Sequence, residues 1–412
     1  MIVKLETHKL MPGMYVVDTG LSWLEHPYLY SREGRLPDRR AVDGILAEGY
    51  AEAFIDTEKS GLDDAAATRL SGASPFADAF NAPPARTPRS APGAAGGKPV
   101  PMRQEGGVAK RIYEDALQFA KEFIGKAYRD KTVDLERSEG FVNEVIASVV
   151  RNRDALTGFC KLRFYDEYTY THSINVTVLA TAFGQFLGLP ETELRPLGLA
   201  ALFHDLGKAN MPRDLINKPG RLTEGEFEII KRHPLESYAL IKEKRSLPHK
   251  VLPGIVDHHE KYDGRGYPRG LQGDAISLFG RIISLADVYD ALTSERVYKK
   301  GMPPYKALGV MYGMRGKDFH PALADRFIKC MGVYPVGSVV RMSDGRYGVV
   351  YSSNPDAPLF PTVKIIRDAD ARPIEPVMAD LSAQEDPGRP ALSIAEAVDP
   401  APLAIDPASV IP

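Results

Sequence analysis

The chain has 412 residues, of which 44% are hydrophobic and 26% charged, so it can bury a sizeable core and form two or three domains. Its 52 Lys and Arg residues stand against 54 Asp and Glu residues, a balance that argues against a nucleic-acid polymer or an anionic membrane as partner. Two cysteines, Cys160 and Cys330, are too few for a disulfide framework or a cysteine metal site, and we expect reduced, buried thiols.

Targeting signals are also missing from the sequence. No apolar segment approaches the length of a membrane span, and the first residues lack the basic-then-apolar order of a signal peptide. We therefore predict a cytoplasmic protein with no membrane span.

The first 58 residues combine short strand-like runs with one helical stretch. Residues 13–18 and 53–56 have the composition of strands, and residues 41–47 have helical spacing. A small α+β module is predicted over residues 1–58, and a protein partner for it stays open. Residues 59–107 are rich in Ala, Pro, Gly and Ser, which bury too little to offset their conformational entropy, so they are predicted to be a disordered linker.

The remainder of the chain divides into a long helical part and a short C-terminal part. Apolar residues recur at three- and four-residue steps through residues 108–331. Within residues 332–381, a Ser-Asp-Gly turn at 343–345 separates two strand-like runs, which predicts a β-hairpin, with residues 362–366 as a third strand. Residues 382–412 are predicted to be a disordered tail. The expected fold is mainly α: a central helical bundle with a small α+β N-terminal module and a short C-terminal β-hairpin extension.

The helical region carries a group of residues that suits a metal site. Neutral imidazole and carboxylate oxygen together bind Fe, Mn or Zn at hydrolytic centres. A lone histidine is more often a core or surface residue than a metal ligand. Adjacent His-Asp and His-His pairs among further histidines make a metal site the more probable interpretation. The candidate ligands are His172, His204, Asp205, His233, His258, His259 and Asp287.

Helical spacing places these candidates on apolar faces. His172 precedes a stripe formed by Val176, Leu179, Phe183 and Phe186, and His204 continues a stripe formed by Leu197 and Ala201. Thr223 and Glu226 have the spacing of a capping box, and Pro234 should kink or end the helix at His233. Ile255 leads to His258 and His259, while Ile283, Asp287 and Asp290 share a face. A bundle can therefore aim all of these side chains into one core site, which would be costly to bury without metal.

At these residues the chain resembles the HD-GYP family, a branch of the HD metal-dependent phosphohydrolase superfamily. The resemblance rests on blocks in the family's order, at residues 204–208 (His-Asp-Leu-Gly-Lys), 218–226, 231–234, 258–268 and 286–293. It spans roughly residues 160–330, with a weaker resemblance of the N-terminal module to one found on such proteins. The central domain is accordingly expected to be an HD-type helical bundle.

The resemblance implies a phosphodiesterase that hydrolyses the bacterial second messenger cyclic di-GMP to linear pGpG, to GMP or to both, by attack of a metal-bridging hydroxide. It implies one metal ion bound by His172, His204, Asp205 and Asp287, and a second bound by Asp205, His233, His258 and His259. Asp205 would then bridge the two ions. The histidine-rich, thiol-free ligand set favours Fe or Mn over Zn, although metal supply can overrule that preference.

Further residues are assigned roles beside the metals. Lys208, one helical turn beyond His204, is expected to stabilise charge on a substrate phosphate, and Arg296 and Lys299 match family positions that contact phosphates. A solvated basic surface is the alternative for these cations. Asp290 is expected to orient a metal ligand, with proton transfer to the leaving oxygen as the alternative role.

The segment Asp-Gly-Arg-Gly-Tyr-Pro at residues 263–268 is expected to shape the substrate pocket. Gly266 allows a close backbone approach, and Tyr267 offers a ring for guanine stacking. An ordinary surface turn with a buried tyrosine is the alternative. Whether Tyr267 contacts guanine or supports the loop stays open.

One departure from the family pattern bears on the number of metals. Some members carry a glutamate one helical turn before the first histidine, where it helps to hold a third metal. Tyr168 occupies that position here, and Glu167 lies off the face of His172. We therefore predict two divalent metal ions and not three.

Two other functions stay open. The first is an HD-type phosphohydrolase for another cyclic dinucleotide or a nucleotide, which would use the same metals. The second is a non-catalytic receptor for cyclic di-GMP, which the complete set of ligands disfavours. The oligomeric state, the final product and the pathway are not indicated by the sequence.

Overall fold

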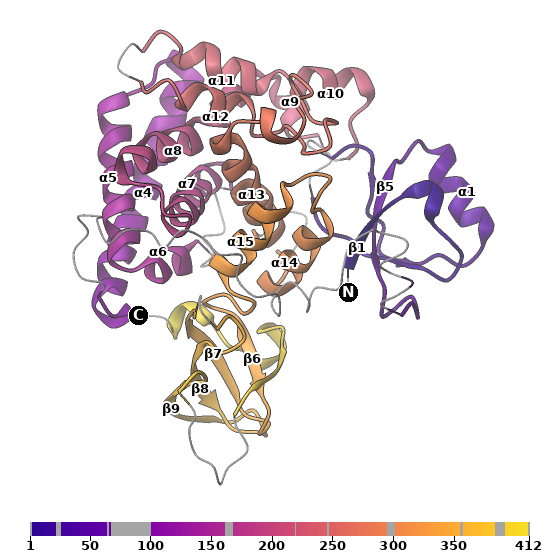
Figure 1. Cartoon of the computed structure of the whole chain (residues 1–412), viewed down its shortest axis with the longest axis vertical. Helices are drawn as coiled ribbons and strands as arrows, with labels where there is room; N and C mark the ends of the chain where they lie inside the picture. The colour runs from indigo at the N-terminus through magenta and orange to yellow at the C-terminus, as the bar shows by residue number, and fades with distance from the viewer. Residues whose placement is uncertain are drawn as a thin grey trace.

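The computed structural model describes residues 2–21, 26–63, 66, 100–160, 168–218, 220–244, 247–294, 301–354, 357–383 and 392–410. The predicted phosphate-contacting residues Arg296 and Lys299, and Glu167, lie outside the described residues. The chain forms an N-terminal α/β module, a helical body and a C-terminal sheet (Figure 1).

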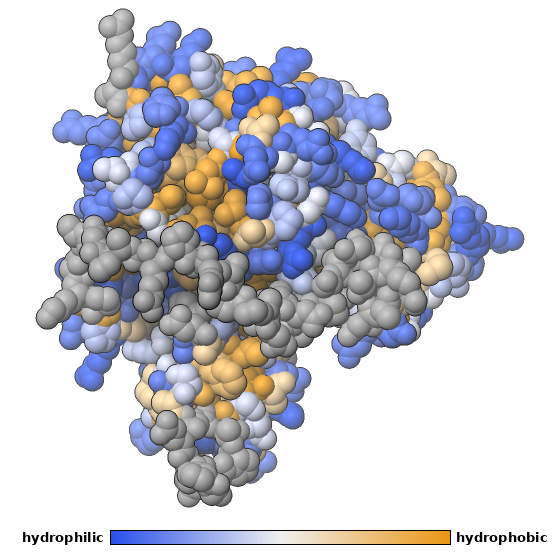
Figure 2. Space-filling model, in the orientation of Figure 1, coloured by the Kyte–Doolittle hydropathy of each residue, from blue (hydrophilic) through white to orange (hydrophobic). Residues whose placement is uncertain are grey.

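The N-terminal module confirms the predicted small α+β fold. Its sheet has the order β1-β5-β2-β4, and β3 pairs with β5. The side chain of Asp38 accepts a hydrogen bond from the Ala41 amide and so caps the helix, which buries Val42 and Ile45. Figure 2 shows hydrophilic residues at the outer tip of the module, where Figure 1 places this helix. The elements are β1 (Ile2–Glu6), η1 (Thr7–Lys9), β2 (Tyr15–Val16), β3 (Leu29–Tyr30), β4 (Gly34–Arg35), α1 (Arg39–Ala47) and β5 (Glu52–Asp56).

The helical body is mostly α, as predicted, and its centre is formed by helices that are buried on nearly every side. α7 packs against both α8 and α13. Long amphipathic helices, α4 and α5, cover this centre from outside (Figure 1). The elements are α4 (Met102–Asp130), α5 (Leu135–Arg151), α6 (Arg153–Phe159), α7 (Tyr168–Phe186), α8 (Glu191–Phe203), η2 (Leu206–Asn210), α9 (Arg213–Ile216), α10 (Glu224–Ile230), α11 (His233–Ile241), α12 (Val251–Val256), η3 (Gly273–Ala275), α13 (Leu278–Thr293), α14 (Pro304–Gly313) and α15 (Pro321–Met331).

The predicted linker over residues 59–107 extends too far. Helix α4 begins at Met102, so the last six residues of that range are helical. Tertiary contacts stabilise this start, because the buried carboxylate of Glu105 accepts hydrogen bonds from Arg151 at 2.7 and 2.8 Å and from Ser148 at 2.8 Å. Local composition, with two glycines at 106 and 107, does not reveal such contacts.

The C-terminal part is a five-stranded antiparallel sheet and not a short hairpin. The predicted hairpin (β6 and β7) and third strand (β8) are present, but the sheet order is β10-β6-β7-β8-β9. β9 contains two prolines and lies at an edge, where a missing N–H breaks no ladder bond. β10 pairs with β6 and comes from the range predicted to be a disordered tail. The elements are β6 (Val339–Met342), β7 (Tyr347–Ser352), β8 (Thr362–Arg367), β9 (Pro373–Asp380), β10 (Ile394–Ala397), η4 (Ala401–Leu403) and η5 (Pro407–Ser409).

Two further predictions can be compared with the described residues. Cys160 and Cys330 are free and buried, as expected, and burial raises the pKa of the Cys330 thiol to about 12. Among the helices of the described ranges, none combines the length and the apolar character that crossing a bilayer requires.

Candidate metal centre

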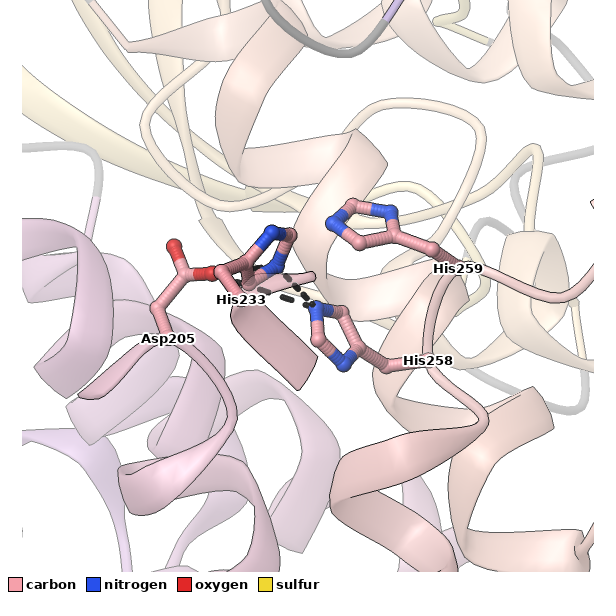
Figure 3. Close-up of side chains that lie close together, drawn as sticks. All are labelled: Asp205, His233, His258 and His259. Atoms are coloured by element: carbon pink, nitrogen blue, oxygen red, sulfur yellow. Dashed lines mark hydrogen bonds and ion pairs between the residues drawn. The ribbon is translucent and has the colours of Figure 1, made fainter. Parts of the chain in front are cut away.

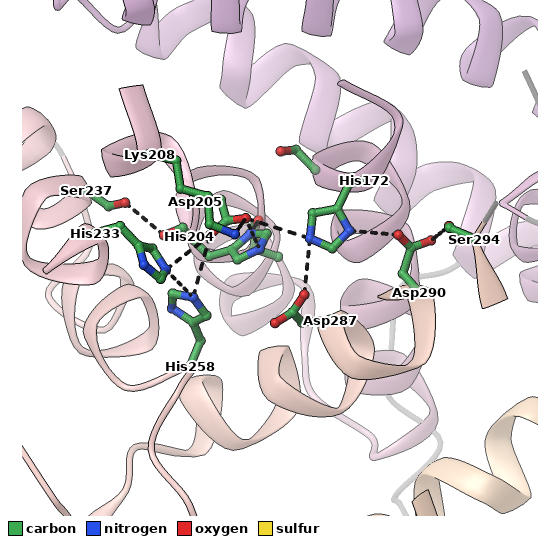
Figure 4. Close-up of polar contacts among 12 residues, drawn as sticks. His172, His204, Asp205, Lys208, His233, Ser237, His258, Asp287, Asp290 and Ser294 are labelled. Atoms are coloured by element: carbon green, nitrogen blue, oxygen red, sulfur yellow. Dashed lines mark hydrogen bonds and ion pairs between the residues drawn. The ribbon is translucent and has the colours of Figure 1, made fainter. Parts of the chain in front are cut away.

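All seven candidate ligands meet inside the helical body, in two adjoining groups. Figure 4 shows six of them, and Figure 3 shows His259. Within each group, one ligand atom from every residue lies within 4.8 Å of the others. We call them the first group, which is His172, His204 and Asp287, and the second group, which is Asp205, His233, His258 and His259 (Figure 3). His172 lies on α7 and Asp287 on α13, while His204 and Asp205 lie between α8 and η2. His233 begins α11, and His258 and His259 lie in the turn after α12.

Two local sequence signals, a capping box and a proline, mark the helix boundaries beside His233. Thr223 and Glu226 form the capping box that starts α10, which ends at Ile230. A new helix, α11, begins at His233 with Pro234 in its first turn. Pro234 was predicted to kink or end the helix at His233, but the helix ends earlier and His233 starts the next one, where its Nε2 atom lies 3.2 Å from Oδ1 of Asp205.

A glycine and a serine clamp the His204-Asp205 segment against α11. A Cβ atom on Gly207 would lie only 2.1 Å from the carbonyl oxygen of His233, so a side chain is excluded at this position. The Ser237 hydroxyl donates to the carbonyl oxygen of His204 at 2.8 Å and accepts from the Gly207 amide at 2.7 Å. These contacts fix the distance between Asp205 and His233.

Hydrogen bonds to Nδ1 set the orientation of four imidazoles. In His204, His233 and His258, Nδ1 lies 2.7, 2.8 and 2.6 Å from the carbonyl oxygen of the residue three positions earlier. The Nδ1 atom of His172 lies 2.7 Å from Oδ2 of Asp290. Each carbonyl or carboxylate requires a donor, so the single proton of a neutral ring resides on Nδ1 and Nε2 carries a lone pair. This is the arrangement that metal-binding histidines adopt.

Asp205 faces both groups with different oxygens. Its Oδ2 lies 3.5 Å from Nε2 of His204 and 3.8 Å from Nε2 of His172. Its Oδ1 lies 3.2 Å from Nε2 of His233 and 3.8 Å from Nε2 of His258. Lys208 donates to Oδ2 at 2.6 Å, as Figure 4 shows. One carboxylate thus stands between two sets of nitrogen ligands.

Burial sets the protonation of these groups. It lowers the pKa of His204, and it lowers the pKa values of His258 and His259 well below the usual 6.5. Burial alone would raise the pKa of Asp205, but Lys208 and the neighbouring histidines hold it well below 3.8. Neutral imidazoles beside an ionised carboxylate are the protonation states that a metal ion requires.

Unsatisfied nitrogens provide a test of whether metal ions fit. Among the described residues, the buried Nε2 atoms of His204 and His259 have no hydrogen-bond partner. The Nε2 atoms of His233 and His258 lie 3.3 Å apart, although both rings already hold their proton on Nδ1. Facing lone pairs in a buried site are unfavourable unless a cation lies between them. The residues therefore fit divalent cations that prefer nitrogen and oxygen ligands.

Asp290 belongs to a network that supports His172. While Oδ2 accepts from His172, Oδ1 accepts from Asn175 at 2.8 Å and from the Ser294 hydroxyl at 3.1 Å. The Tyr113 hydroxyl in turn donates to Oδ1 of Asn175 at 2.7 Å. Asn175 and Tyr113 were not predicted from sequence. Asn175 lies one turn after His172 on α7, so helical spacing could have placed it on the same face as this ligand. Nothing in the sequence connects Tyr113 on α4 to this site.

The loop after His259 folds back over the second group. The Tyr267 ring stacks on the His259 ring with centroids 4.8 Å apart, and the Tyr267 amide donates to the carbonyl oxygen of His259 at 3.2 Å. A Cβ atom on Gly266 would lie 2.2 Å from the Lys261 amide nitrogen, so this fold requires glycine. Only 9% of Tyr267 is exposed, which supports its role as a prop for the loop over guanine stacking.

Family models match each part of the fold. The model described as "HD domain" matches residues 153–323. A domain of unknown function (DUF3391) matches residues 2–138, and a KOW domain associated with HD domains matches residues 339–404. The last match agrees with the five-stranded sheet observed there.

Three curated proteins illustrate what the chain is similar to. "Cyclic di-GMP phosphodiesterase PA4108" of Pseudomonas aeruginosa is 34% identical over 92% of this chain and 89% of its own length. The "Cyclic di-GMP phosphodiesterase response regulator RpfG" of Xanthomonas campestris pv. campestris is 38% identical over 43% of this chain and 48% of its own length. A "3'3'-cGAMP-specific phosphodiesterase 3" of Vibrio cholerae is 40% identical over 35% of this chain and 31% of its own length.

Proposed function

This chain belongs to the HD-GYP family of HD-domain cyclic di-GMP phosphodiesterases, and we propose that it hydrolyses cyclic di-GMP where the two groups of ligands adjoin. The observation that carries the proposal is the position of Asp205, whose two oxygens face separate sets of imidazole nitrogens at 3.2–3.8 Å. A single carboxylate shared by two such sets is the ligand arrangement of a binuclear centre.

The two groups would hold two divalent ions. His172, His204, Asp205 and Asp287 would bind one ion, and Asp205, His233, His258 and His259 would bind the other. When bound, such a pair acidifies a water molecule and neutralises charge on the attacked phosphodiester. Iron or manganese is proposed because every ligand is nitrogen or oxygen, and two ions are proposed because Tyr168 replaces the ligand of a third.

Lys208 would supply a cation beside the reacting phosphate. Its ammonium group is held 2.6 Å from Asp205, and its side chain is only 13% exposed. A positive charge fixed in a poorly solvated site stabilises negative charge that develops on phosphate oxygens. Arg296 and Lys299 are proposed to contact the substrate phosphates on the family resemblance alone.

The remaining residues position the machinery. Asp290 orients His172 because both of its oxygens are occupied by donors from the protein, which leaves the general-acid role as the less favoured alternative. Gly266 permits the close turn of the loop, and Tyr267 supports His259 at the edge of the pocket.

A second substrate deserves a parallel test. Opening one phosphodiester bond of cyclic di-GMP gives linear pGpG, and cleaving the second gives GMP. A relative named for 3'3'-cGAMP shares 40% identity over 35% of this chain, which makes a mixed cyclic dinucleotide the second substrate to test. Residues that contact the bases, and not the metal ligands, decide between these substrates.

The test is a product assay on protein reloaded with iron or manganese. We expect two metal ions per chain and conversion of cyclic di-GMP to pGpG, GMP or both, with 3'3'-cGAMP as the competitor. Tight nucleotide binding without turnover in any metal would favour the receptor, and faster turnover of 3'3'-cGAMP would favour the alternative substrate.

Variants of the ligands test the location of the site. His204→Ala and Asp205→Ala should lose both metal and turnover, while His249→Ala, at an exposed histidine outside the two groups, should retain both. If metal content and hydrolysis survive in the first two variants, the assigned site is wrong.

A further inference from the structure

The N-terminal module contributes a buried cation to the helical body. Lys4, at the centre of β1, is only 2% exposed. Its ammonium group lies 2.8 Å from Oδ2 and 3.1 Å from Oδ1 of Asp318, and 2.8 Å from Glu52 on β5. Figure 1 shows β1 beside α14, whose following turn carries Asp318. Two parts of the chain separated by more than 300 residues thus share one ion cluster.

The same cluster includes the loop that carries two metal ligands. Lys261, two residues after His259, lies 2.9 Å from Oδ1 of Asp318. Backbone bonds strengthen this connection, because the amide of Tyr262 donates to the carbonyl oxygen of Asp318 at 3.1 Å. The amide of Asp263 donates to the carbonyl oxygen of residue 317 at 2.8 Å. Asp318 therefore joins the Lys4 ammonium group directly to the start of the loop.

A second contact joins another side of the module to the segment before α10. Arg221 donates to the carbonyl oxygens of Glu48 and Gly49 at 2.6 and 3.1 Å, and its guanidinium lies 4.4 Å from the centroid of the Tyr50 ring. This fixes the segment before α10 to the module.

Aromatic contacts continue from the module to a metal ligand. Tyr28 of the module meets Phe227 of α10 edge to face, with ring centroids 6.2 Å apart. Phe227 meets Tyr267 in the same way at 5.7 Å, and Tyr267 stacks on His259. Two independent sets of contacts from the module thus converge on the residues around His259.

We propose that the N-terminal module holds the second group of ligands in position. Lys4 is the positioning residue, and it acts through Asp318 and Lys261. The inference rests on the metal site of the proposed function. Lys4 is the cation that the module contributes to this cluster, and its removal leaves the partly buried carboxylate of Glu52 and the buried carboxylate of Asp318, with Lys261 still paired to Asp318. Breaking a buried ion pair from one side is strongly unfavourable, so the loop must rearrange.

The experiment compares Lys4→Met and Arg221→Ala with Lys9→Met, which removes a half-exposed lysine from the same module. Two readouts are measured on the full chain: manganese bound per chain, and amide hydrogen exchange of the metal-free protein. Lys4→Met is expected to bind one manganese ion and not two, and to exchange at least tenfold faster over residues 258–268. The first group should be unaffected, so exchange over residues 170–183 of α7, which carries His172, should match that of Lys9→Met.

Further variants separate positioning from folding. Lys4→Arg keeps the charge and is expected to restore the second manganese ion. If Lys4→Met does not fold, Arg221→Ala decides, because its contacts lie at the surface and it should fold while loosening the same loop. Two bound ions and unchanged exchange over residues 258–268 in the folded variants would overturn the inference. A wild-type chain that binds fewer than two ions would count against the proposed metal site instead, and hydrogen exchange would still decide the role of the module.

Discussion

Replacing Asp290 with asparagine separates the two roles that this carboxylate can have. Asp290 accepts three hydrogen bonds, from His172 at 2.7 Å, Asn175 at 2.8 Å and Ser294 at 3.1 Å. Asparagine has the same shape, but one of its positions is an amide donor. That donor must point either at the amide of Asn175 or at Nδ1 of His172, so one of these contacts becomes repulsive.

The size of the effect follows from the position of Asp290 behind a metal ligand. Loss of such a partner typically weakens metal binding about 10–100-fold, which corresponds to about 1.4–2.7 kcal/mol. We expect this loss only at the first group, because no member of the second group contacts Asp290 in the described residues. Tyr113→Phe, which removes a hydroxyl one contact further away, should have a smaller effect in the same direction.

The assay is a titration of the metal-free protein with manganese, followed by turnover at low and at saturating metal. Asp115→Asn, at an exposed position of α4, is the matched control. If Asp290 orients His172, the affinity of one site falls and excess metal restores most of the activity. Unchanged binding at both sites with a loss of turnover that metal cannot restore would refute this reasoning and assign Asp290 to proton transfer.

Three further predictions concern stability and reactivity. Ser237→Ala leaves the amide of Gly207 and the carbonyl of His204 without their buried hydrogen-bond partner. It should lower the free energy of unfolding of the metal-free protein by about 2–4 kcal/mol in a urea titration. An unchanged urea midpoint would contradict this prediction. Burial holds the pKa values of His258 and His259 well below 6.5, so the unfolded chain binds more protons and metal-free stability must fall as the pH drops below 6.5, by up to about 1.4 kcal/mol per pH unit for each histidine. If the stability of the metal-free protein between pH 7 and 5 changes as it does in a variant with asparagine at both positions, this prediction is wrong. Because the pKa of Cys330 is raised to about 12, iodoacetamide at pH 8 should alkylate this residue only after unfolding, as read by peptide mapping.

The helical part of the fold was predictable because its signals are local. The capping box predicted at Thr223 is confirmed. The prediction that a helix kinks or ends at His233 is wrong in its position, because α10 ends at Ile230 and His233 begins the next helix with Pro234 in its first turn. The C-terminal sheet was underestimated for the opposite reason. β10 is four residues long, and its pairing with β6 is a contact between segments far apart in the chain, which local composition does not encode.

In the candidate site, too, local signals were predictable and long-range contacts were not. Residue type and helical spacing were sufficient to find the ligands, although His258 and His259 lie in the turn after α12 and not on a helix. The residues that support those ligands were harder to find, because Tyr113, Ser237 and Lys4 make their hydrogen bonds and ion pairs with residues far away in the sequence. Such partners depend on how helices pack, and any buried hydroxyl or lysine has many other uses.

The central claim is that two metal ions share Asp205, and anomalous diffraction from crystals of the manganese-loaded protein tests it most directly. The account predicts two peaks about 3.5–4 Å apart, one in each group of ligands, with one oxygen of Asp205 bound to each. A single peak, or two peaks of which only one contacts Asp205, would contradict it.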